Sequence, residues 1–197
     1  TPRMQAQVDA VRYIAEHTDL LPVGMCIGPF SLMTKLISDP ITPIALAGYG
    51  VTAETDEDVR TVERALELAM MIITRSITAQ ADAGAEAIFI AEPAANLVFL
   101  SPNQIAVGSG IFERYVMTYN RQVKRLLNDL EVDLIFHDCG ELTDTMVREF
   151  GTLHPVLLSL GSSRTLWEDA ALLPKDVVLF GNLPSKRFYS DALISDA

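Results

Sequence analysis

The sequence predicts an α/β protein in which five parallel strands alternate with helices. Short apolar runs of strand length recur along the chain, each bounded by Gly, Pro or charged residues. Between them lie longer stretches whose apolar residues recur every three or four positions, which is typical of helices that cover a sheet. Apolar residues make up 49% of the chain, as expected of strands that are buried on both faces.

Each element has a local signal. Thr1-Pro2 and Ser101-Pro102 pair a capping residue with proline at the first helical position, and Thr55 precedes an acidic first turn. The predicted helices span residues 1–17, 32–37, 55–84, 101–126 and 164–172, with a short one that ends at Gly151 and a last one from about 184. The predicted strands span residues 22–28, 87–91, 132–139, 155–160 and 177–180. Residues 40–54 contain two prolines and two glycines and are expected to be irregular.

Length and composition limit the class of protein. A chain of 197 residues suffices for one domain, and we expect residues 1–197 to form a single unit. Five βα units fit either a complete doubly wound five-stranded sheet or part of an eight-stranded barrel, which needs about 250 residues. Residue periodicity leaves both architectures open.

Several partners and locations are disfavoured. The formal net charge of −11 argues against nucleic-acid binding, which needs a basic surface. No apolar run reaches the ~18 residues that span a membrane, and no signal peptide is visible. The two cysteines, Cys26 and Cys139, are far apart, which argues against a disulfide-rich secreted protein and favours the cytoplasm.

The stretch that ends in His137, Asp138 and Cys139 holds the strongest candidate site. Residues two apart on a strand share a face, so His137 and Cys139 are predicted to project together near the carboxyl end of their strand. Imidazole and thiolate are zinc ligands, which predicts a metal site. Asp138 is expected to face away in a structural role, and Cys26 to be a small core residue.

Other candidates follow the ends of neighbouring strands. Glu92 could act in catalysis or contact substrate, or it could be a solvated loop carboxylate. Asn182 could hydrogen-bond substrate or satisfy the backbone of its loop. Gly28 and Phe30 are predicted to shape the floor of the binding site.

Five stretches in this order together resemble the uroporphyrinogen decarboxylase superfamily: residues 28–33, 83–93, 100–102, 136–140 and 179–183. The resemblance spans most of the chain and implies a (β/α)8 barrel, of which about five βα units are present. Family chains are longer at both ends, so the chain is expected to be an incomplete barrel domain that is inactive alone. The absent N-terminal portion would carry the catalytic aspartate of the decarboxylases.

The His-x-Cys pair is similar to the zinc site of one branch of this superfamily, which transfers methyl groups from methylcobalamin to thiols such as coenzyme M. The resemblance implies a Zn²⁺ ion on His137 and Cys139, with a third cysteine ligand beyond Ala197. It also implies a corrinoid methyl donor, a small thiol acceptor and a corrinoid protein as partner. Two alternatives stay open. One is a metal-free uroporphyrinogen decarboxylase that acts on a tetrapyrrole in porphyrin biosynthesis, and the other is a non-catalytic relative that binds a corrinoid or a metal.

Overall fold

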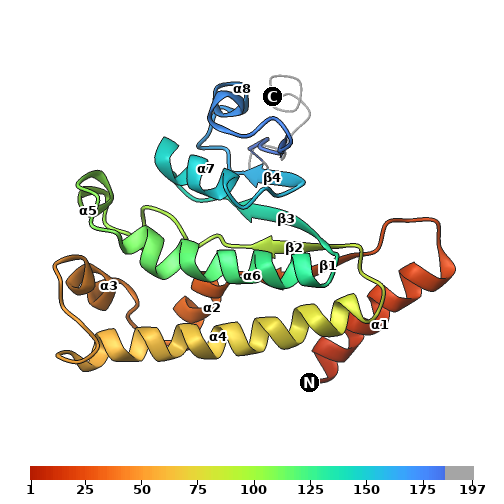
Figure 1. The fold of residues 1–197 in the computed structure, drawn as a ribbon, viewed down its shortest axis with the longest axis horizontal. Coiled ribbons are helices and arrows are strands. Elements are labelled where there is room, and N and C mark those ends of the chain that lie inside the picture. Colours follow the sequence, from red (N-terminus) through yellow and green to blue (C-terminus); the bar gives the residue numbers. More distant parts are fainter. Residues whose placement is uncertain (185–197) are drawn as a thin grey trace.

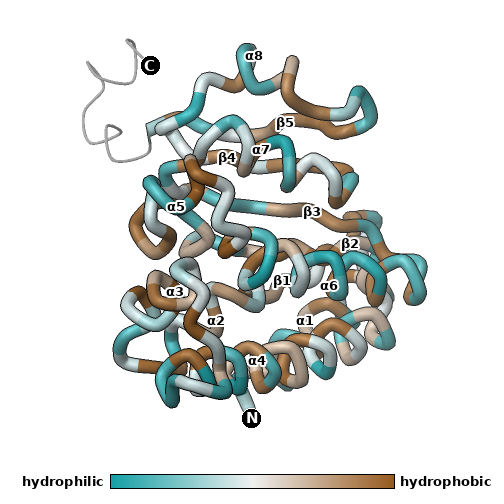
Figure 2. Tube along the Cα trace, turned by 60° about the vertical axis from the view of Figure 1, so that its left-hand side comes forward, coloured by the Kyte–Doolittle hydropathy of each residue, from teal (hydrophilic) through white to brown (hydrophobic). Residues whose placement is uncertain are grey.

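The computed structural model describes residues 1–184, which form one parallel sheet covered by helices (Figure 1). The strands are β1 Val23–Ile27, β2 Ala87–Ala91, β3 Asp133–Asp138, β4 Leu157–Leu160 and β5 Val178–Phe180. They lie in sequence order from β1 to β5, and every neighbouring pair is parallel (Figure 2). A doubly wound sheet reverses its strand order at a switch point. This sheet does not reverse, so the predicted part of a barrel is confirmed and the doubly wound alternative is rejected.

The helices are α1 Pro2–His17, α2 Pro29–Leu36, α3 Ile41–Gly48, α4 Glu57–Ala81, α5 Pro102–Ala106, α6 Thr118–Asp129, α7 Asp144–Gly151 and α8 Leu166–Asp169. A π-helix, η1 (Glu113–Met117), runs into α6, and a 3₁₀ turn, η2 (Ala170–Leu172), follows α8. No helix within residues 1–184 has the length and apolar character needed to cross a bilayer. The helix predicted from residue 184 lies outside the described residues.

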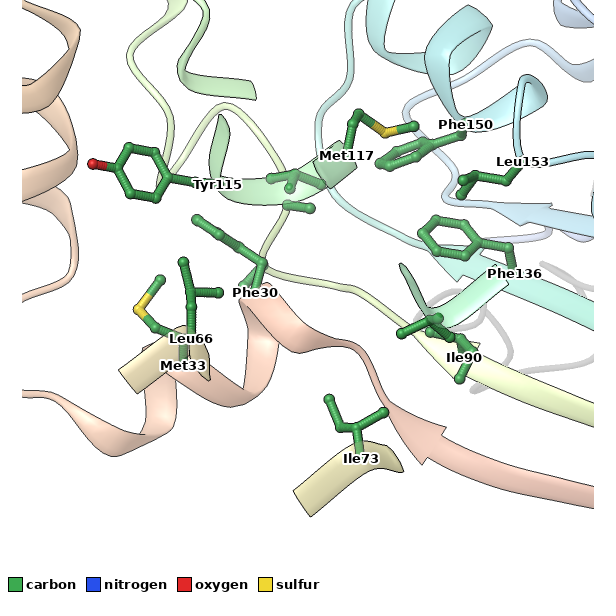
Figure 3. Close-up of a cluster of buried hydrophobic side chains, with 14 of the residues drawn as sticks. Phe30, Met33, Leu66, Ile73, Ile90, Tyr115, Met117, Phe136, Phe150 and Leu153 are labelled. Carbon is green, nitrogen blue, oxygen red and sulfur yellow. The ribbon is translucent and has the colours of Figure 1, made fainter. Parts of the chain in front are cut away.

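The core lies between the helices and one face of the sheet. Alternate strand residues such as Ile90 and Phe136 point into it, where they meet Phe30, Ile73 and Phe150 from the helices (Figure 3). These five side chains are all fully buried. Burial of apolar surface at about 25 cal/mol per Å² makes this layer the main source of stability.

The opposite face of the sheet is open, which corrects the prediction that the first strand is buried on both faces. Val23 and Met25 of β1 are 37% and 54% exposed, and Val178 and Phe180 of β5 are 56% and 57% exposed. The strand register places these side chains on one face. In a complete barrel this face is the interior, so it is apolar although it faces solvent here.

The free edge of β1 is partly covered by glutamine side chains. Met25 N donates to Gln80 Oε1 at 2.8 Å, and Gln80 Nε2 donates back to Met25 O at 3.2 Å. Gln7 Nε2 also donates to Met25 O, at 2.5 Å. Gly24 lets Gln80 come this close, because a Cβ on Gly24 would lie 2.7 Å from Gln80 Oε1. Side chains therefore satisfy the central peptide groups of this edge strand.

Helix α3 contradicts the prediction of an irregular segment over residues 40–54. Pro43 lies in the first turn of α3, where a missing backbone N–H costs no helical hydrogen bond. The Asp39 carboxylate accepts from Ile41 N and Thr42 N at 3.0 and 3.1 Å and so caps the helix. Proline, which was read as a sign of irregular structure, is therefore compatible with a helix start at this position.

The single helix predicted over residues 101–126 is divided in the structure. Helix α5 ends at Ala106, and Gly108 and Gly110 then adopt φ values of 71° and 77°, which only glycine takes readily. Helical structure resumes before η1 and continues through α6. The glycines thus break the helix instead of only weakening its first turns.

Candidate metal centre

A pocket of about 680 Å³ lies at the carboxyl ends of β3, β4 and β5. Its wall comes from the ends of these strands and the residues that follow them. The lining residues are His137, Cys139, Ser159, Leu160, Gly161, Ser162, Gly181, Asn182, Leu183 and Pro184. The strand ends therefore bring three of the predicted site residues, His137, Cys139 and Asn182, to one cavity, as parallel strands commonly do.

The imidazole of His137 is held on two sides. Its Nδ1 is hydrogen-bonded to Ser159 Oγ at 3.0 Å, and its ring stacks on Phe89 with 5.6 Å between centroids. Ser159 is the register partner of His137 on β4. Burial lowers the pKa of His137, and the contact with Ser159 only partly opposes this. The ring is therefore neutral at neutral pH, and Nε2 remains for a further ligand.

Cys139 is exposed at the same pocket. Gly161, at the end of β4, lies directly beside its backbone. A Cβ on Gly161 would lie 2.4 Å from Cys139 O, so no larger residue fits without moving the cysteine. The absence of a side chain at Gly161 thus lets the segment that carries Cys139 follow the end of β4 closely.

These residues fit zinc as two of its ligands. A neutral imidazole and an accessible thiol are the donors that zinc prefers, and catalytic zinc sites use three protein ligands plus one open position. Within residues 1–184, no group of three or more His, Cys, Asp and Glu side chains is placed to hold a metal ion. The described residues therefore supply an incomplete ligand set, which a donor from outside them would have to complete.

Asn182 lies in the pocket wall and is used locally. Its Nδ2 donates to Gly161 O at 3.1 Å and to Arg164 O at 2.5 Å. Both protons of the amide nitrogen therefore hold the loop after β4, as in the second of the two readings drawn from the sequence. The predicted contact of Asn182 with substrate remains a prediction.

Glu92 lies on the other face of the sheet, away from this pocket. Ala91 pairs with His137, so Glu92, the next residue, points toward the helices. Its fully buried carboxylate accepts from Phe30 N at 2.9 Å, Ser31 N at 2.8 Å and Asn120 Nδ2 at 3.0 Å. Burial raises the pKa of Glu92, and these hydrogen bonds partly oppose the rise. The reading of Glu92 as a solvated loop carboxylate is therefore wrong. Glu92 does not line this pocket, and its predicted catalytic role remains a prediction.

Gly28 and Phe30 form part of the same buried arrangement. A Cβ on Gly28 would lie 2.3 Å from the Glu92 Cδ, so glycine is required for the carboxylate to reach α2. Phe30 is fully buried and packs edge-on against Phe99. Gly28 and Phe30 are buried in the core and do not line this pocket, and the prediction that they shape the floor of a substrate site remains a prediction.

Asp138 and Cys26 have the structural roles expected of them. Asp138 is fully buried, and its Oδ1 accepts from Gly140 N at 2.7 Å, which fixes the turn after β3. Burial raises the pKa of Asp138 well above its usual range, and the hydrogen bond from Gly140 partly opposes this. Cys26 is half-buried and packs against the core, as predicted.

Ser159 and Gly161 were missed in the sequence. Ser159 is the one polar residue in the apolar run over residues 156–160, and this isolation is a signal that could have singled it out. The sequence gives no strand register, however, and without the register neither residue could be placed beside His137 or Cys139.

Comparisons with known proteins bear on the fold and the family of the chain. The chain is 26% identical over 146 residues to the methylcobamide:CoM methyltransferase MtbA of Methanosarcina mazei, and the match covers 73% of this chain and 38% of that protein. A solved structure, a methyltransferase from Methanosarcina mazei, superposes with a TM-score of 0.69 at 19% identity, over 91% of this chain and 48% of that one. The chain thus spans less than half of either relative. The sequence model of the uroporphyrinogen decarboxylase (URO-D) family matches residues 1–192, and the chain therefore belongs to that family.

Proposed function

We propose that the protein is a zinc-dependent methyltransferase that moves a methyl group between a corrinoid and a small thiol. The observation that carries this proposal is the convergence of His137 and Cys139 on one pocket at the carboxyl end of the sheet. Similarity to a methylcobamide:CoM methyltransferase supports the reaction class. Because the chain spans only part of its relatives, the proposal concerns the full-length protein.

The residues of the pocket would divide the work. Zinc, when bound, lowers the pKa of a coordinated thiol from about 8.5, so that the acceptor is a thiolate at neutral pH. His137 would donate the lone pair of Nε2, and Cys139 would bind as thiolate after losing its proton. The acceptor sulfur would then form a bond to the methyl carbon while the carbon–cobalt bond breaks and its electron pair stays on cobalt.

The shape of the pocket is consistent with this use. Its volume of about 680 Å³ exceeds what a small thiol needs, which leaves room for the methyl donor to approach. The open, apolar sheet face beside it would be enclosed by the rest of a barrel, which excludes water from the thiolate. A third zinc ligand, expected as a cysteine beyond Ala197, belongs to the proposal.

Metal analysis and a methyl-transfer assay on the full-length protein test the proposal. We expect one zinc per chain and transfer from methylcobalamin to coenzyme M. His137→Ala and Cys139→Ala should each lose methyl transfer and bind zinc much more weakly than wild type. His17→Ala and Cys26→Ala are matched controls, because His17 lies at the end of α1 and Cys26 on the helix-covered face. Wild-type protein without zinc, or full activity in His137→Ala, would contradict the proposal.

A second candidate is a metal-free decarboxylase, because the family model that matches residues 1–192 is that of uroporphyrinogen decarboxylase. It predicts that the protein converts uroporphyrinogen to coproporphyrinogen. This activity should persist in the presence of a metal chelator and in the Cys139→Ala variant. The two candidates are therefore separated by the metal dependence of whichever activity is found.

A further inference from the structure

The hydrogen bond between Ser159 and His137 can favour one tautomer of the neutral imidazole. A neutral imidazole carries one N–H, on either Nδ1 or Nε2. If Nε2 gives its lone pair to a metal, the proton must be on Nδ1, where it needs an acceptor. Ser159 Oγ lies 3.0 Å from Nδ1 and is the atom that can accept it.

The surroundings of Ser159 favour a specific purpose for this hydroxyl. Ser159 is 6% exposed in a strand whose other members, Leu157, Leu158 and Leu160, are apolar. A buried hydroxyl without a hydrogen-bond partner is costly, so the Ser159 hydroxyl needs a partner here. The register places it directly across from His137, which provides that partner.

The ring also has little freedom to rotate away. Phe89 of β2 stacks on it from the strand on the other side. Gly181, which follows β5, lies close to Ser159, and a Cβ on Gly181 would lie 3.5 Å from Ser159 Oγ. The imidazole thus lies between the Phe89 ring and the Ser159 hydroxyl.

We propose that Ser159 is a positioning residue that holds His137 in the Nδ1-protonated form and thereby raises the affinity of the site for zinc. The inference rests on the proposed function, because it concerns the same metal. Removing a partner that orients a metal-bound histidine typically weakens metal binding about 10–100-fold. Gly161 complements this role by leaving room for the backbone of Cys139.

The test compares zinc affinity among variants of the full-length protein, measured by competition with a chromophoric chelator. Ser159→Ala should bind zinc about 10–100-fold more weakly than wild type. Ser159→Thr keeps the hydroxyl and should restore the affinity. Ser163→Ala is the matched control, because this exposed serine does not line the pocket and its hydroxyl donates to Gly140 O, not to His137. Its zinc affinity should equal that of wild type.

A second comparison separates positioning from general stability. In a His137→Ala background, adding Ser159→Ala should change the residual zinc affinity no further, because the hydroxyl then has nothing to orient. Without zinc, wild type, Ser159→Ala and Ser159→Thr should differ in melting temperature in a pattern that does not match their differences in zinc affinity. Equal zinc affinity in wild type and Ser159→Ala, or failure of Ser159→Thr to restore it, would overturn the inference. Wild-type protein that binds no zinc would instead overturn the proposed function.

Discussion

Two neighbouring strands, β2 and β3, end in polar residues that differ in burial and in hydrogen bonding. The Glu92 carboxylate, after β2, is buried and hydrogen-bonded to three donors, two of them on α2. The His137 and Cys139 pair, at the end of β3, lines an open pocket, and the only hydrogen bond of the His137 side chain to the described residues is the one to Ser159. A polar group whose bonding capacity is used within the fold stabilises the fold, whereas one that retains capacity can bind a ligand.

The face of the sheet to which each side chain points determines whether it is buried or lines the pocket. Glu92 and Asp138 point toward the helices, where both are fully buried and an unpaired carboxylate is costly. His137 points toward the face that a complete barrel would enclose around its site. Position at a strand's carboxyl end therefore does not by itself indicate function, because adjacent residues there face different environments.

The comparison predicts its largest effect on stability at Glu92. Glu92→Ala leaves Phe30 N and Ser31 N without an acceptor in the core, at about 1–3 kcal/mol for each unsatisfied donor. We expect a loss of about 3 kcal/mol in the free energy of unfolding, measured by urea denaturation, with unchanged zinc affinity in the folded protein. Glu141→Ala, at an exposed carboxylate after β3, is the control and should be close to wild type. Lost methyl transfer with unchanged stability in Glu92→Ala would instead favour a catalytic role.

A somewhat smaller effect is expected at Gly28. The backbone there has φ −72° and ψ 160°, which any residue adopts, so Gly28→Ala tests only the contact with the Glu92 carboxylate. Overpacking of this kind costs about 1–3 kcal/mol. In a double-mutant cycle, the cost should shrink when Glu92 is already alanine, because the clashing atoms are gone. Strictly additive costs would show that the two residues do not interact.

Much of this arrangement follows from the sequence, but the pairing of distant segments does not. The strand over 87–91 is correct to the residue, because a short apolar run is bounded by charge and turn signals on both sides. Strand alternation also places His137 and Cys139 together. Glu92 could not be assigned, because its partners Phe30 and Ser31 lie about sixty residues earlier, on a helix whose approach to β2 only the fold determines.

The two cysteines also lie on different faces of the sheet, and we expect a smaller difference in stability between their alanine variants. Cys139→Ala removes an exposed side chain and should stay within the roughly 0.5 kcal/mol spread of surface substitutions in the metal-free protein. Cys26→Ala removes a half-buried sulfur that packs on the core, and should cost about 1 kcal/mol, nearer the average for point mutations. Urea denaturation of both variants measures this. A larger cost at Cys139 would mean that the pocket is closed in solution.

Thiol chemistry gives the finest test of the same difference. Burial raises the pKa of Cys26 to about 11, a hydrogen bond from Ser76 partly opposes this, and the nearby Glu92 adds to it. At pH 8 about one Cys26 side chain in a thousand is therefore a thiolate, so a disulfide reagent should modify Cys139 alone.

The folded state holds the Cys26 proton more tightly than the unfolded state, whose thiol pKa is near 9.0. The contribution of the protonated Cys26 thiol to stability is thus complete below pH 9 and is lost as the pH rises through about 11.

In Cys139→Ala, modification of Cys26 at pH 8 should be absent and should appear only as the pH approaches 11. Rapid modification of that variant at pH 8 would show that the helix-covered face admits solvent, and the contrast between the two faces would fail.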